Sequence, residues 1–213
     1  MVAFLFDLEG TLVFARHVHI SATRYALSKR KFPFKGFKSY PGVDFPTLIR
    51  KNYPQLQDKD LEEIIADEIE YFAKNVSKVI LFKDTIPTLK KIYKKVPISL
   101  VTNEYEQEVN AILTTFKLSK FFKKVYYYKK RSPKNFQTLS DFSKRAPCPI
   151  SEIRIVGDTN SDVFFAKKYG LECYVVERFK GNKIVEYEKA HFIKTLLDLR
   201  DIPSSNFEGG INV

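Results

Sequence analysis

Acidic and polar residues follow three apolar segments of this sequence. A carboxylate is costly to remove from water, so an acid that ends a buried segment either lies in a solvated turn or is held for its charge. The residues that follow the three segments are Asp7, Glu9, Gly10, Thr11, Thr102, Asn103, Gly157, Asp158 and Asp162. Because the pattern recurs three times, turn chemistry alone explains it poorly.

These residue types suit phosphoryl transfer to a carboxylate, assisted by Mg²⁺. One or two carboxylates and a carbonyl are enough to hold Mg²⁺, which prefers oxygen ligands. Glu9 lies two residues beyond Asp7 on the same side of the chain, where it is placed to protonate a leaving oxygen and later to activate water. Gly10 and Thr11 offer a turn and backbone N–H groups to a phosphate. Thr102 adds a hydroxyl, and a lysine is needed to offset the remaining negative charge.

Alternating strands and helices are expected to bring these three ends together. Apolar runs predict strands at 2–7, 96–103, 124–128, 152–158 and 173–177, and amphipathic spacing predicts helices at 20–32, 44–53, 58–76, 84–95, 104–118, 136–146 and 161–170. Strands that alternate with helices in this way indicate βαβ units and a parallel sheet. Ligands bind such sheets at the carboxyl ends of the strands, where all three polar ends fall.

The helical stretch after the first strand predicts a second unit. The expected architecture is an α/β, Rossmann-like parallel sheet with helices on both faces, formed by residues 1–13 and 84–213, with a small all-α cap domain inserted at 14–83. This insert is expected to lie over the end of the strand that carries Asp7 and Glu9. The chain beyond residue 203 is expected to be a loose tail.

The polar motifs resemble three ordered motifs of the haloacid dehalogenase-like hydrolase superfamily. The matching stretches are Asp7-Leu8-Glu9-Gly10-Thr11-Leu12, Leu100-Val101-Thr102-Asn103 and Val156-Gly157-Asp158-Thr159-Asn160-Ser161-Asp162. The resemblance extends from residue 2 to residue 177, and the insert lies where members with an α-helical cap carry it. It implies that Asp7 is the nucleophile and lies at the metal. It also implies that Asp158 and the main-chain carbonyl of Glu9 bind Mg²⁺, with Asp162 at or just behind the ion.

The resemblance also implies a phosphate-binding lysine between the second and third motifs. The stretch 130–136 is similar to the family's Lys-Pro-x-Pro-x-x-Phe, which puts the functional amine on Lys130. Lys134, which opens the following helix, is the alternative. The predicted phosphate-binding set is Gly10, Thr11, Thr102, Asn103 and Lys130.

Glu9 departs from the family pattern, because most phosphatases of the family have aspartate there. Glutamate keeps the carboxylate and adds a methylene, which changes its reach. Dehalogenases of the family lack this second acid and need no metal, so the sequence argues against a dehalogenase.

The resulting prediction is a Mg²⁺-dependent phosphatase that acts on a small phosphomonoester through an aspartyl-phosphate on Asp7, with Glu9 as general acid and base. A phosphotransferase or mutase, in which an acceptor hydroxyl replaces water, is the alternative of the same class.

The charge of the chain allows a third interpretation, a non-catalytic protein that binds nucleic acid or an acidic partner. The sequence has 36 Lys and Arg against 25 Asp and Glu, a formal net charge of +11. The basic residues are scattered, with the densest cluster at 129–134, and a scattered excess is more typical of a solvated surface than of a nucleic-acid footprint. A small phosphorylated substrate is therefore the expected partner.

The cysteines, the histidines and Arg16 are given no part in the proposed chemistry. Only two cysteines, Cys148 and Cys173, and no apolar stretch of membrane-spanning length favour a cytoplasmic protein with no membrane partner. Both cysteines are interpreted as packing residues. His17 and His19, at the start of the insert, are interpreted as surface or partly packed side chains. Arg16 beside them is the better candidate for a contact with substrate.

Overall fold

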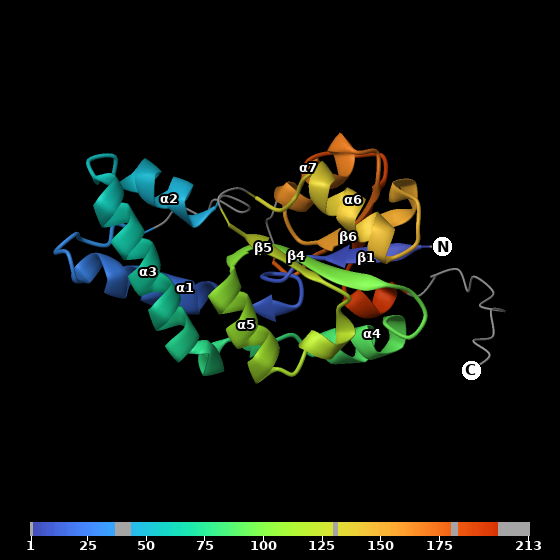
Figure 1. The fold of residues 1–213 in the computed structure, drawn as a ribbon, viewed down its shortest axis with the longest axis horizontal. Helices are drawn as coiled ribbons and strands as arrows, with labels where there is room; N and C mark the ends of the chain where they lie inside the picture. The colour runs from blue at the N-terminus through green and yellow to red at the C-terminus, as the bar shows by residue number, and fades with distance from the viewer. Residues whose placement is uncertain (1, 37–43, 130–131, 180–182, 200–213) are drawn as a thin grey trace.

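The apolar segments form a six-stranded sheet in which every neighbouring pair of strands is parallel (Figure 1). The computed structural model describes residues 2–36, 44–129, 132–179 and 183–199. The strands, in the sheet order β5-β4-β1-β6-β7-β8, are β5 (Val125–Tyr128), β4 (Ile98–Tyr105), β1 (Ala3–Phe6), β6 (Ile153–Gly157), β7 (Glu172–Val176) and β8 (Ala190–Ile193). The predicted α/β, Rossmann-like fold is confirmed.

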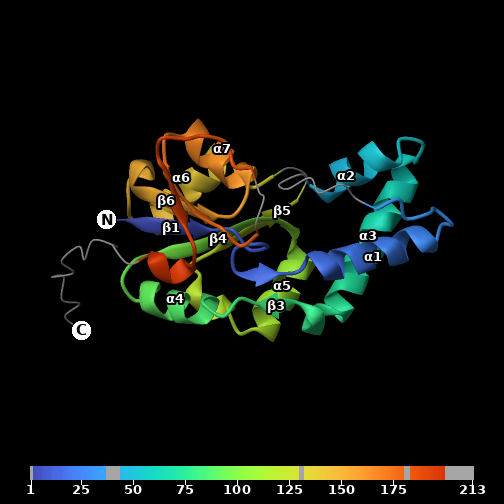
Figure 2. The ribbon, with the colours of Figure 1, turned by 180° about the vertical axis from the view of Figure 1, so that it is seen from behind.

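Helices cover both faces of this sheet, so β1 at its centre is buried on both sides. The covering helices are α4 (Thr85–Ile92), α5 (Glu106–Thr115), α6 (Phe136–Arg145) and α7 (Asn160–Lys168). Helices α4 and α5 lie on one face and α6 and α7 on the other (Figure 1, Figure 2). Phe4 and Phe6 of β1 belong to the core beneath α4 and α5. Ala3 and Leu5 belong to the core beneath α6 and α7, which explains the uninterrupted apolar run.

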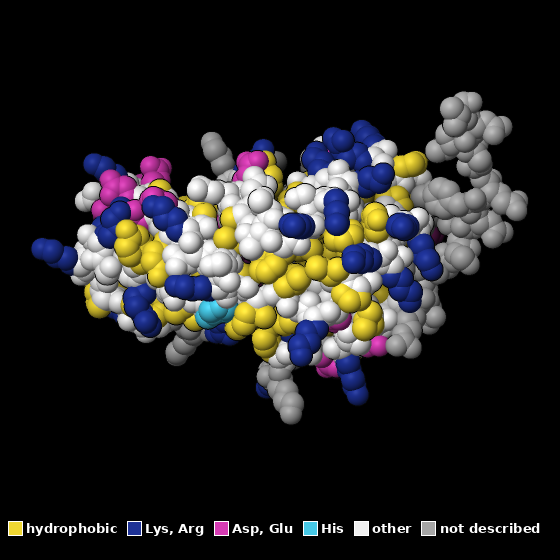
Figure 3. Space-filling view, turned by 90° about the horizontal axis from the view of Figure 1, so that it is seen from below, with side chains coloured by type: hydrophobic (Ala, Val, Ile, Leu, Met, Phe, Trp, Pro, Cys, Tyr) yellow, Lys and Arg dark blue, Asp and Glu magenta, His cyan; other side chains and the backbone are white. Residues whose placement is uncertain are grey.

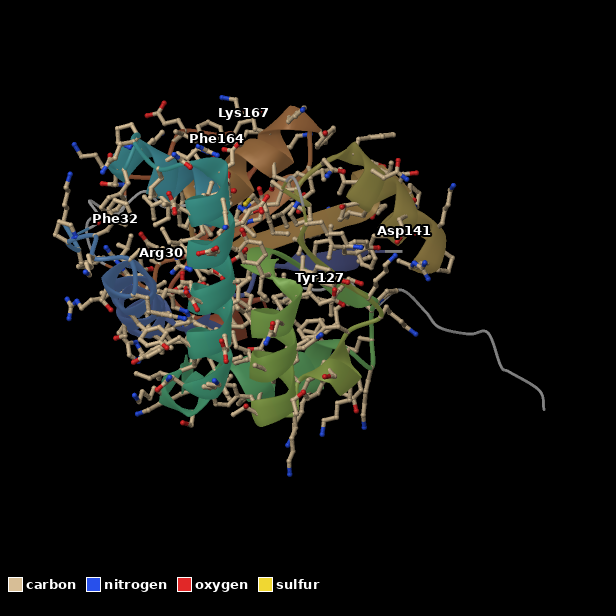
Figure 4. The ribbon with its side chains drawn as sticks, turned by 60° about the vertical axis from the view of Figure 1, so that its left-hand side comes forward. Arg30, Phe32, Tyr127, Asp141, Phe164 and Lys167 are labelled. Atoms are coloured by element: carbon tan, nitrogen blue, oxygen red, sulfur yellow. The ribbon has the colours of Figure 1, made fainter. Side chains whose placement is uncertain are left out.

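The insert contains three helices with a small core of their own. These are α1 (Arg16–Ser28), α2 (Phe45–Asn52) and α3 (Asp58–Lys74), and their apolar side chains form a separate cluster. Arg30, labelled in Figure 4, ties the end of α1 to α3 through Asp67 (2.6 Å) and Glu63 (3.0 Å). Figure 4 also shows α3 standing beside α5 of the sheet domain.

A two-stranded antiparallel ribbon joins the two ends of the insert. Its strands are β2 (Val13–Phe14) and β3 (Ile80–Leu81), with Val13 opposite Leu81. The limits of the insert, residues 14 and 83, remain a prediction. The ribbon lies next to both limits, because β2 ends at Phe14 and β3 ends at Leu81. Four short 3₁₀ helices complete the described elements, at Val76–Lys78, Ser119–Phe121, Ile150–Glu152 and Leu196–Asp198.

Several elements differ from the sequence prediction. Helix α1 spans Arg16–Ser28 rather than 20–32, and the short strands β2 and β3 are not among the predicted strands. Two further differences have identifiable reasons. Strand β4 continues to Tyr105, so α5 begins at Glu106 rather than at 104. The Tyr105 N–H donates to the Glu108 carboxylate (2.9 Å), which fixes the start of that helix. Strand β8 was not predicted at all. It is a four-residue edge strand with His191 and Phe192 exposed, so it lacks the apolar run that marks the buried strands.

The surface and the cysteines bear on the predictions about partners. None of the helices in the described part of the chain is long and apolar enough to cross a membrane. Cys148 and Cys173 are free and buried, which confirms their interpretation as packing residues. On the face shown in Figure 3, Lys and Arg side chains are spread over both ends of the molecule with apolar side chains between them.

Candidate active site

The three motifs lie at the carboxyl ends of three adjacent strands. Strand β1 pairs with β4 on one side and with β6 on the other. The Asp7 N–H donates to the Val156 carbonyl (2.8 Å), which places Asp7 just beyond the last ladder pair. Asp158 follows β6 directly, and Thr102 lies within β4, which continues past it. The parallel sheet thus brings these residues together as the sequence predicted.

Three aspartates form a buried group at this edge, which we call the active-site carboxylates (Asp7, Asp158 and Asp162). Carboxylate oxygens of the three lie within 4.8 Å of one another. Asp162 lies in the first turn of α7, where one of its oxygens accepts from the Thr159 N–H (3.1 Å) and hydroxyl (2.9 Å). Asp162 thus completes a capping box with the N-cap Thr159, and this contact is compatible with the predicted place of its side chain at the metal.

Lys134 supplies the positive charge of the group. Its Nζ lies 2.9 Å from Asp7 Oδ1 and 2.7 Å from Asp162 Oδ1, and its side chain is 6% exposed. Burial lowers the pKa of Lys134, but the Asp162 and Asp7 carboxylates outweigh burial and raise the pKa above its ordinary value, so the amine is charged. Lys130, the first choice from the sequence, lies outside the described residues. The structure therefore places the alternative, Lys134, against the expected nucleophile.

The active-site carboxylates carry more negative charge than one ammonium offsets. Burial raises the pKa of Asp7 to about 8, although Lys134 acts in the opposite direction. Burial, followed by the charges of Asp7 and Asp162, raises the pKa of Asp158 to about 9. A divalent cation would relieve this repulsion, and buried carboxylate oxygens are the donors that Mg²⁺ prefers. The residues at the site therefore fit a divalent metal.

Two glycines allow the carboxylates to approach the backbone closely. Gly10 has a φ of +82°, and a Cβ there would overlap the carboxylate of Asp158. A Cβ at Gly157 would overlap the carboxylate of Asp162. Each glycine thus leaves room for an aspartate of the group, a role beyond the turn that the sequence predicted for Gly10.

Glu9 and Thr11 lie at the edge of this group. The hydroxyl of Thr11 is 3.4 Å from Asp158 Oδ1 and 3.5 Å from Asp7 Oδ2. The Glu9 carboxylate does not belong to the active-site carboxylates found among the described residues. Its Oε1 accepts from the Ala15 N–H (3.4 Å), immediately before α1. The structure therefore places the Glu9 side chain between the sheet and the insert.

Asn103 and Ser132, the latter not predicted, position the segment that carries Lys134. The Ser132 hydroxyl donates to Asn103 Oδ1 (2.6 Å) and accepts from the Lys134 N–H (3.3 Å). Asn135 caps α6 through the Thr138 N–H (3.2 Å) and donates to the Ser132 carbonyl (2.9 Å). Asn103 therefore acts here by holding a loop. Thr102 is buried, and its Oγ1 accepts from the Glu104 N–H (3.3 Å).

Asp84 and Arg178 form a buried ion pair that the sequence analysis does not predict. It contacts the first motif, 7–12, through the Thr11 carbonyl. The Arg178 guanidinium donates to both carboxylate oxygens of Asp84 (2.9 and 2.8 Å) and to the Thr11 carbonyl (2.8 Å). Asp84 also accepts from the Thr195 hydroxyl (2.7 Å) and the Leu196 N–H (2.8 Å). Burial raises the pKa of Asp84, but these donors outweigh it and hold the pKa below its ordinary value. Figure 2 shows the red C-terminal segment that carries Leu196 beside α4.

The side chains at the start of the insert follow the sequence interpretation in part. His17 and His19 are partly packed, which confirms that interpretation, and His17 Nε2 lies 2.7 Å from the Lys78 carbonyl. Arg16 is exposed, and its contact with substrate stays a prediction.

Known proteins resemble this chain over most of its length. A family model described as haloacid dehalogenase-like hydrolase matches residues 4–176. A phosphoglycolate phosphatase from Pseudomonas fluorescens (strain Pf0-1) is 24% identical over 184 residues, which cover 79% of this chain and 66% of the relative. A second one, from Pseudomonas savastanoi pv. phaseolicola (strain 1448A / Race 6), is 28% identical over 212 residues, or 92% of this chain and 77% of the relative. The chain thus spans 66% to 77% of the length of these two proteins.

A solved structure supports the same fold. The crystal structure of a predicted phosphoglycolate phosphatase from Haemophilus somnus superposes with a TM-score of 0.78 at 17% identity, covering 92% of this chain and 95% of that one. At this identity the superposition shows a shared fold.

Proposed function

The chain belongs to the haloacid dehalogenase-like hydrolase family, and on this premise we propose that it hydrolyses a small phosphomonoester with the help of Mg²⁺. Family membership confirms the resemblance that the sequence motifs predicted, and relatives named as phosphatases support the expected class of enzyme, a hydrolase of phosphomonoesters. The observation that carries the proposal is the buried contact of Lys134 with Asp7 beside Asp158 and Asp162. It unites a nucleophile, a cation for phosphate and oxygen ligands for a metal.

Asp7 is the proposed nucleophile. Its carboxylate oxygen attacks phosphorus, so that a bond from Asp7 to phosphorus forms as the bond from phosphorus to the alcohol oxygen breaks. The Lys134 ammonium, 2.9 Å from Asp7 Oδ1, favours the ionised carboxylate that this step needs. Mg²⁺ bound to Asp7, Asp158, Asp162 and the Glu9 carbonyl would supply further positive charge to the transferring phosphoryl group. Lys134 and the N–H groups after Gly10 would orient its oxygens.

Glu9 is the proposed general acid and base. It gives a proton to the departing alcohol oxygen, which leaves with the electron pair of the broken bond. A water molecule then attacks the aspartyl-phosphate, its proton passes to the Glu9 carboxylate, and Asp7 is restored as phosphate is released. The contact of Glu9 with the Ala15 N–H ties its orientation to the insert. The insert at 14–83 is proposed as a cap that excludes water and selects the substrate.

The names of the relatives suggest a first substrate to test. Both curated relatives are phosphoglycolate phosphatases, so phosphoglycolate heads a panel of small phosphorylated metabolites. The net charge of +11 suits an anionic substrate of this size. A cytoplasmic location remains a prediction from the cysteine content.

Phosphate release from p-nitrophenyl phosphate and from this panel, with Mg²⁺ and with a chelator, tests the proposal. We expect Mg²⁺-dependent turnover that Asp7→Asn reduces by about a thousandfold or more, because the nucleophile is lost. Asp58→Asn, an exposed acid at the start of α3, is the matched control and should leave turnover unchanged. Full activity in Asp7→Asn would overturn the scheme. Transfer of the phosphate to an added alcohol would indicate the phosphotransferase instead.

A further inference from the structure

A second group of ionisable side chains lies between the insert and the sheet domain, next to Glu9 of the proposed active site. We call it the His19 cluster (His19, Glu68, Glu104 and Glu108). His19 Nδ1 lies 3.0 Å from Glu68 Oε1 and 3.7 Å from Glu108 Oε1. His19 Nε2 faces the other way and lies 3.2 Å from Glu104 Oε2. The imidazole is thus surrounded by three carboxylates.

The cluster joins two parts of the chain that are distant in sequence. His19 comes from α1 and Glu68 from α3, both in the insert, whereas Glu104 lies on β4 and Glu108 on α5. Helix α3 stands beside α5 in Figure 1 and Figure 4, which brings the two sides together. Phe72 stacks on the His19 ring at 4.3 Å between centroids and fixes its plane.

One carboxylate oxygen of the cluster is buried without a hydrogen-bond donor from the described residues. The Glu108 side chain is 1% exposed, and among the described residues no group donates a hydrogen bond to its Oε1, which faces His19 Nδ1 at 3.7 Å. Its other oxygen, Oε2, accepts from the Tyr105 N–H, which turns Oε1 toward His19 and Glu68. A buried acceptor with no donor is uncommon and indicates an unfilled interaction. Here it is directed at two potential metal ligands.

The charge of the cluster is also unbalanced. Within the part of the chain that the structure describes, the salt bridges of Glu68, Glu104 and Glu108 all lead to His19. Burial lowers the pKa of His19, but Glu104 and Glu68 outweigh burial and raise the pKa to about 10. Even a charged imidazole leaves these three carboxylates, with the Glu9 carboxylate nearby, opposed by one positive charge. Either protons or a bound cation must supply the remainder.

We propose that the His19 cluster binds a divalent transition-metal ion of the Zn²⁺ type through His19 Nδ1, Glu68 Oε1 and Glu108 Oε1. Zinc–ligand bonds of about 2.0 to 2.1 Å in a tetrahedron place the ligand atoms roughly 3.3 Å apart. The two distances from His19 Nδ1, 3.0 and 3.7 Å, fall on either side of that value. The imidazole ligand favours Zn²⁺ over Mg²⁺ and so separates this site from the active-site carboxylates.

The surroundings of the three ligands have the form of a metal site's outer shell. Histidine ligands usually pair their second ring nitrogen with a carboxylate, and Glu104 Oε2 lies 3.2 Å from Nε2, although Nε2 makes no hydrogen bond with the described residues. Carboxylate ligands are themselves hydrogen-bonded, as Glu108 is to the Tyr105 N–H. A bound ion would link the insert to the sheet domain. The proposal does not depend on the proposed hydrolysis of phosphomonoesters.

Equilibrium dialysis of the metal-free, full-length chain against Zn²⁺ in excess Mg²⁺ tests this site. The Asp158→Asn background removes an active-site carboxylate that could bind Zn²⁺. We expect one Zn²⁺ per chain, with a rise in Tm, and visible absorption bands of nitrogen and oxygen coordination when Co²⁺ replaces it. His19→Gln, Glu68→Gln and Glu108→Gln should each weaken binding by about tenfold or more. His191→Gln, an exposed histidine on β8, is the matched control and should bind as the parent does.

Circular dichroism of every variant establishes that it is folded before its binding is compared. Failure of the folded Asp158→Asn protein to bind Zn²⁺ would overturn the proposal. So would unchanged binding in folded His19→Gln and Glu108→Gln. Because the readout is bound metal and not turnover, a failure of the proposed phosphatase activity would leave this test intact.

Discussion

The active-site carboxylates and the His19 cluster differ in what opposes their charge. In the first group, the Lys134 ammonium contacts two of the three aspartates, and Asp162 also accepts two hydrogen bonds from Thr159. In the second group, one imidazole faces three glutamates, and no described residue donates a hydrogen bond to Glu108 Oε1. The first group therefore contains a cation of its own, which contacts two of its members. The second depends on protons or a metal that come from solution.

The two groups also differ in where their members lie. All three active-site carboxylates and Lys134 come from the sheet domain, at or near the ends of β1 and β6 and before α6. The His19 cluster takes two members from the insert and two from the sheet domain. Movement of the insert would therefore leave the first group intact and separate the second. This difference makes the charge balance of each group testable by itself.

Among the variants that test this comparison of the two groups, removing the lysine is expected to have the largest effect. Lys134→Ala should lower kcat/KM by about 10² to 10³, the usual cost of losing one preorganised donor to a developing oxyanion, because Asp7 and Asp162 also lose their cation. Steady-state kinetics with saturating Mg²⁺ measures it. Lys130→Ala is the comparison, since the sequence favoured that residue. A larger loss in Lys130→Ala than in Lys134→Ala would assign the phosphate contact to Lys130 instead.

The choice between these lysines shows how far the sequence could predict the site. The three motifs predicted which strand ends meet, because parallel strands place their carboxyl ends at one edge. They could not predict which amine reaches Asp7, because this depends on the path of the loop before α6. The Ser132 hydroxyl forms hydrogen bonds with Asn103 and with the Lys134 N–H, and these contacts hold Lys134 in position. No local sequence pattern predicts them.

The same limit applies to the fold. Buried strands such as β1 were predictable from their apolar runs, and α3 from its amphipathic spacing. The edge strand β8 was not, because it is short and half exposed. The partner of Asp84 was equally unpredictable, since Arg178 lies 94 residues further along the chain. Sequence patterns thus identified the elements and motifs, whereas long-range polar contacts required the structure.

Breaking the buried pair behind the first motif should have the next largest effect. Arg178→Gln leaves Asp84 buried without its main partner, so we expect the free energy of unfolding to fall by about 3 kcal/mol. Urea denaturation measures this loss. Arg145→Gln breaks an exposed pair with Asp141 and is the control, with an expected loss below about 1 kcal/mol. Equal losses in the two variants would show that the buried pair stabilises the protein no more than the exposed pair does.

The smallest expected effect concerns the charge of Glu108. Burial, with the neighbouring Glu68 and Glu104 carboxylates, raises the pKa of Glu108 well above its ordinary value. Without metal, the folded protein therefore keeps a proton that the unfolded chain releases. The contribution of Glu108 to stability is then full below its unfolded pKa of about 4.3 and declines as the pH rises toward the folded pKa.

Glu108→Gln should remove that decline, because glutamine carries no charge and can still accept from the Tyr105 N–H. In EDTA at pH 8 we expect its Tm to exceed that of the wild type by about 2 to 4 °C, and the difference to shrink near pH 4. Glu62→Gln, an exposed acid on α3, is the control and should show no such change. A lower Tm for Glu108→Gln at both pH values would contradict this account of the cluster. With Zn²⁺ the order should reverse, because only the wild type keeps all three ligands and gains stability from the bound ion.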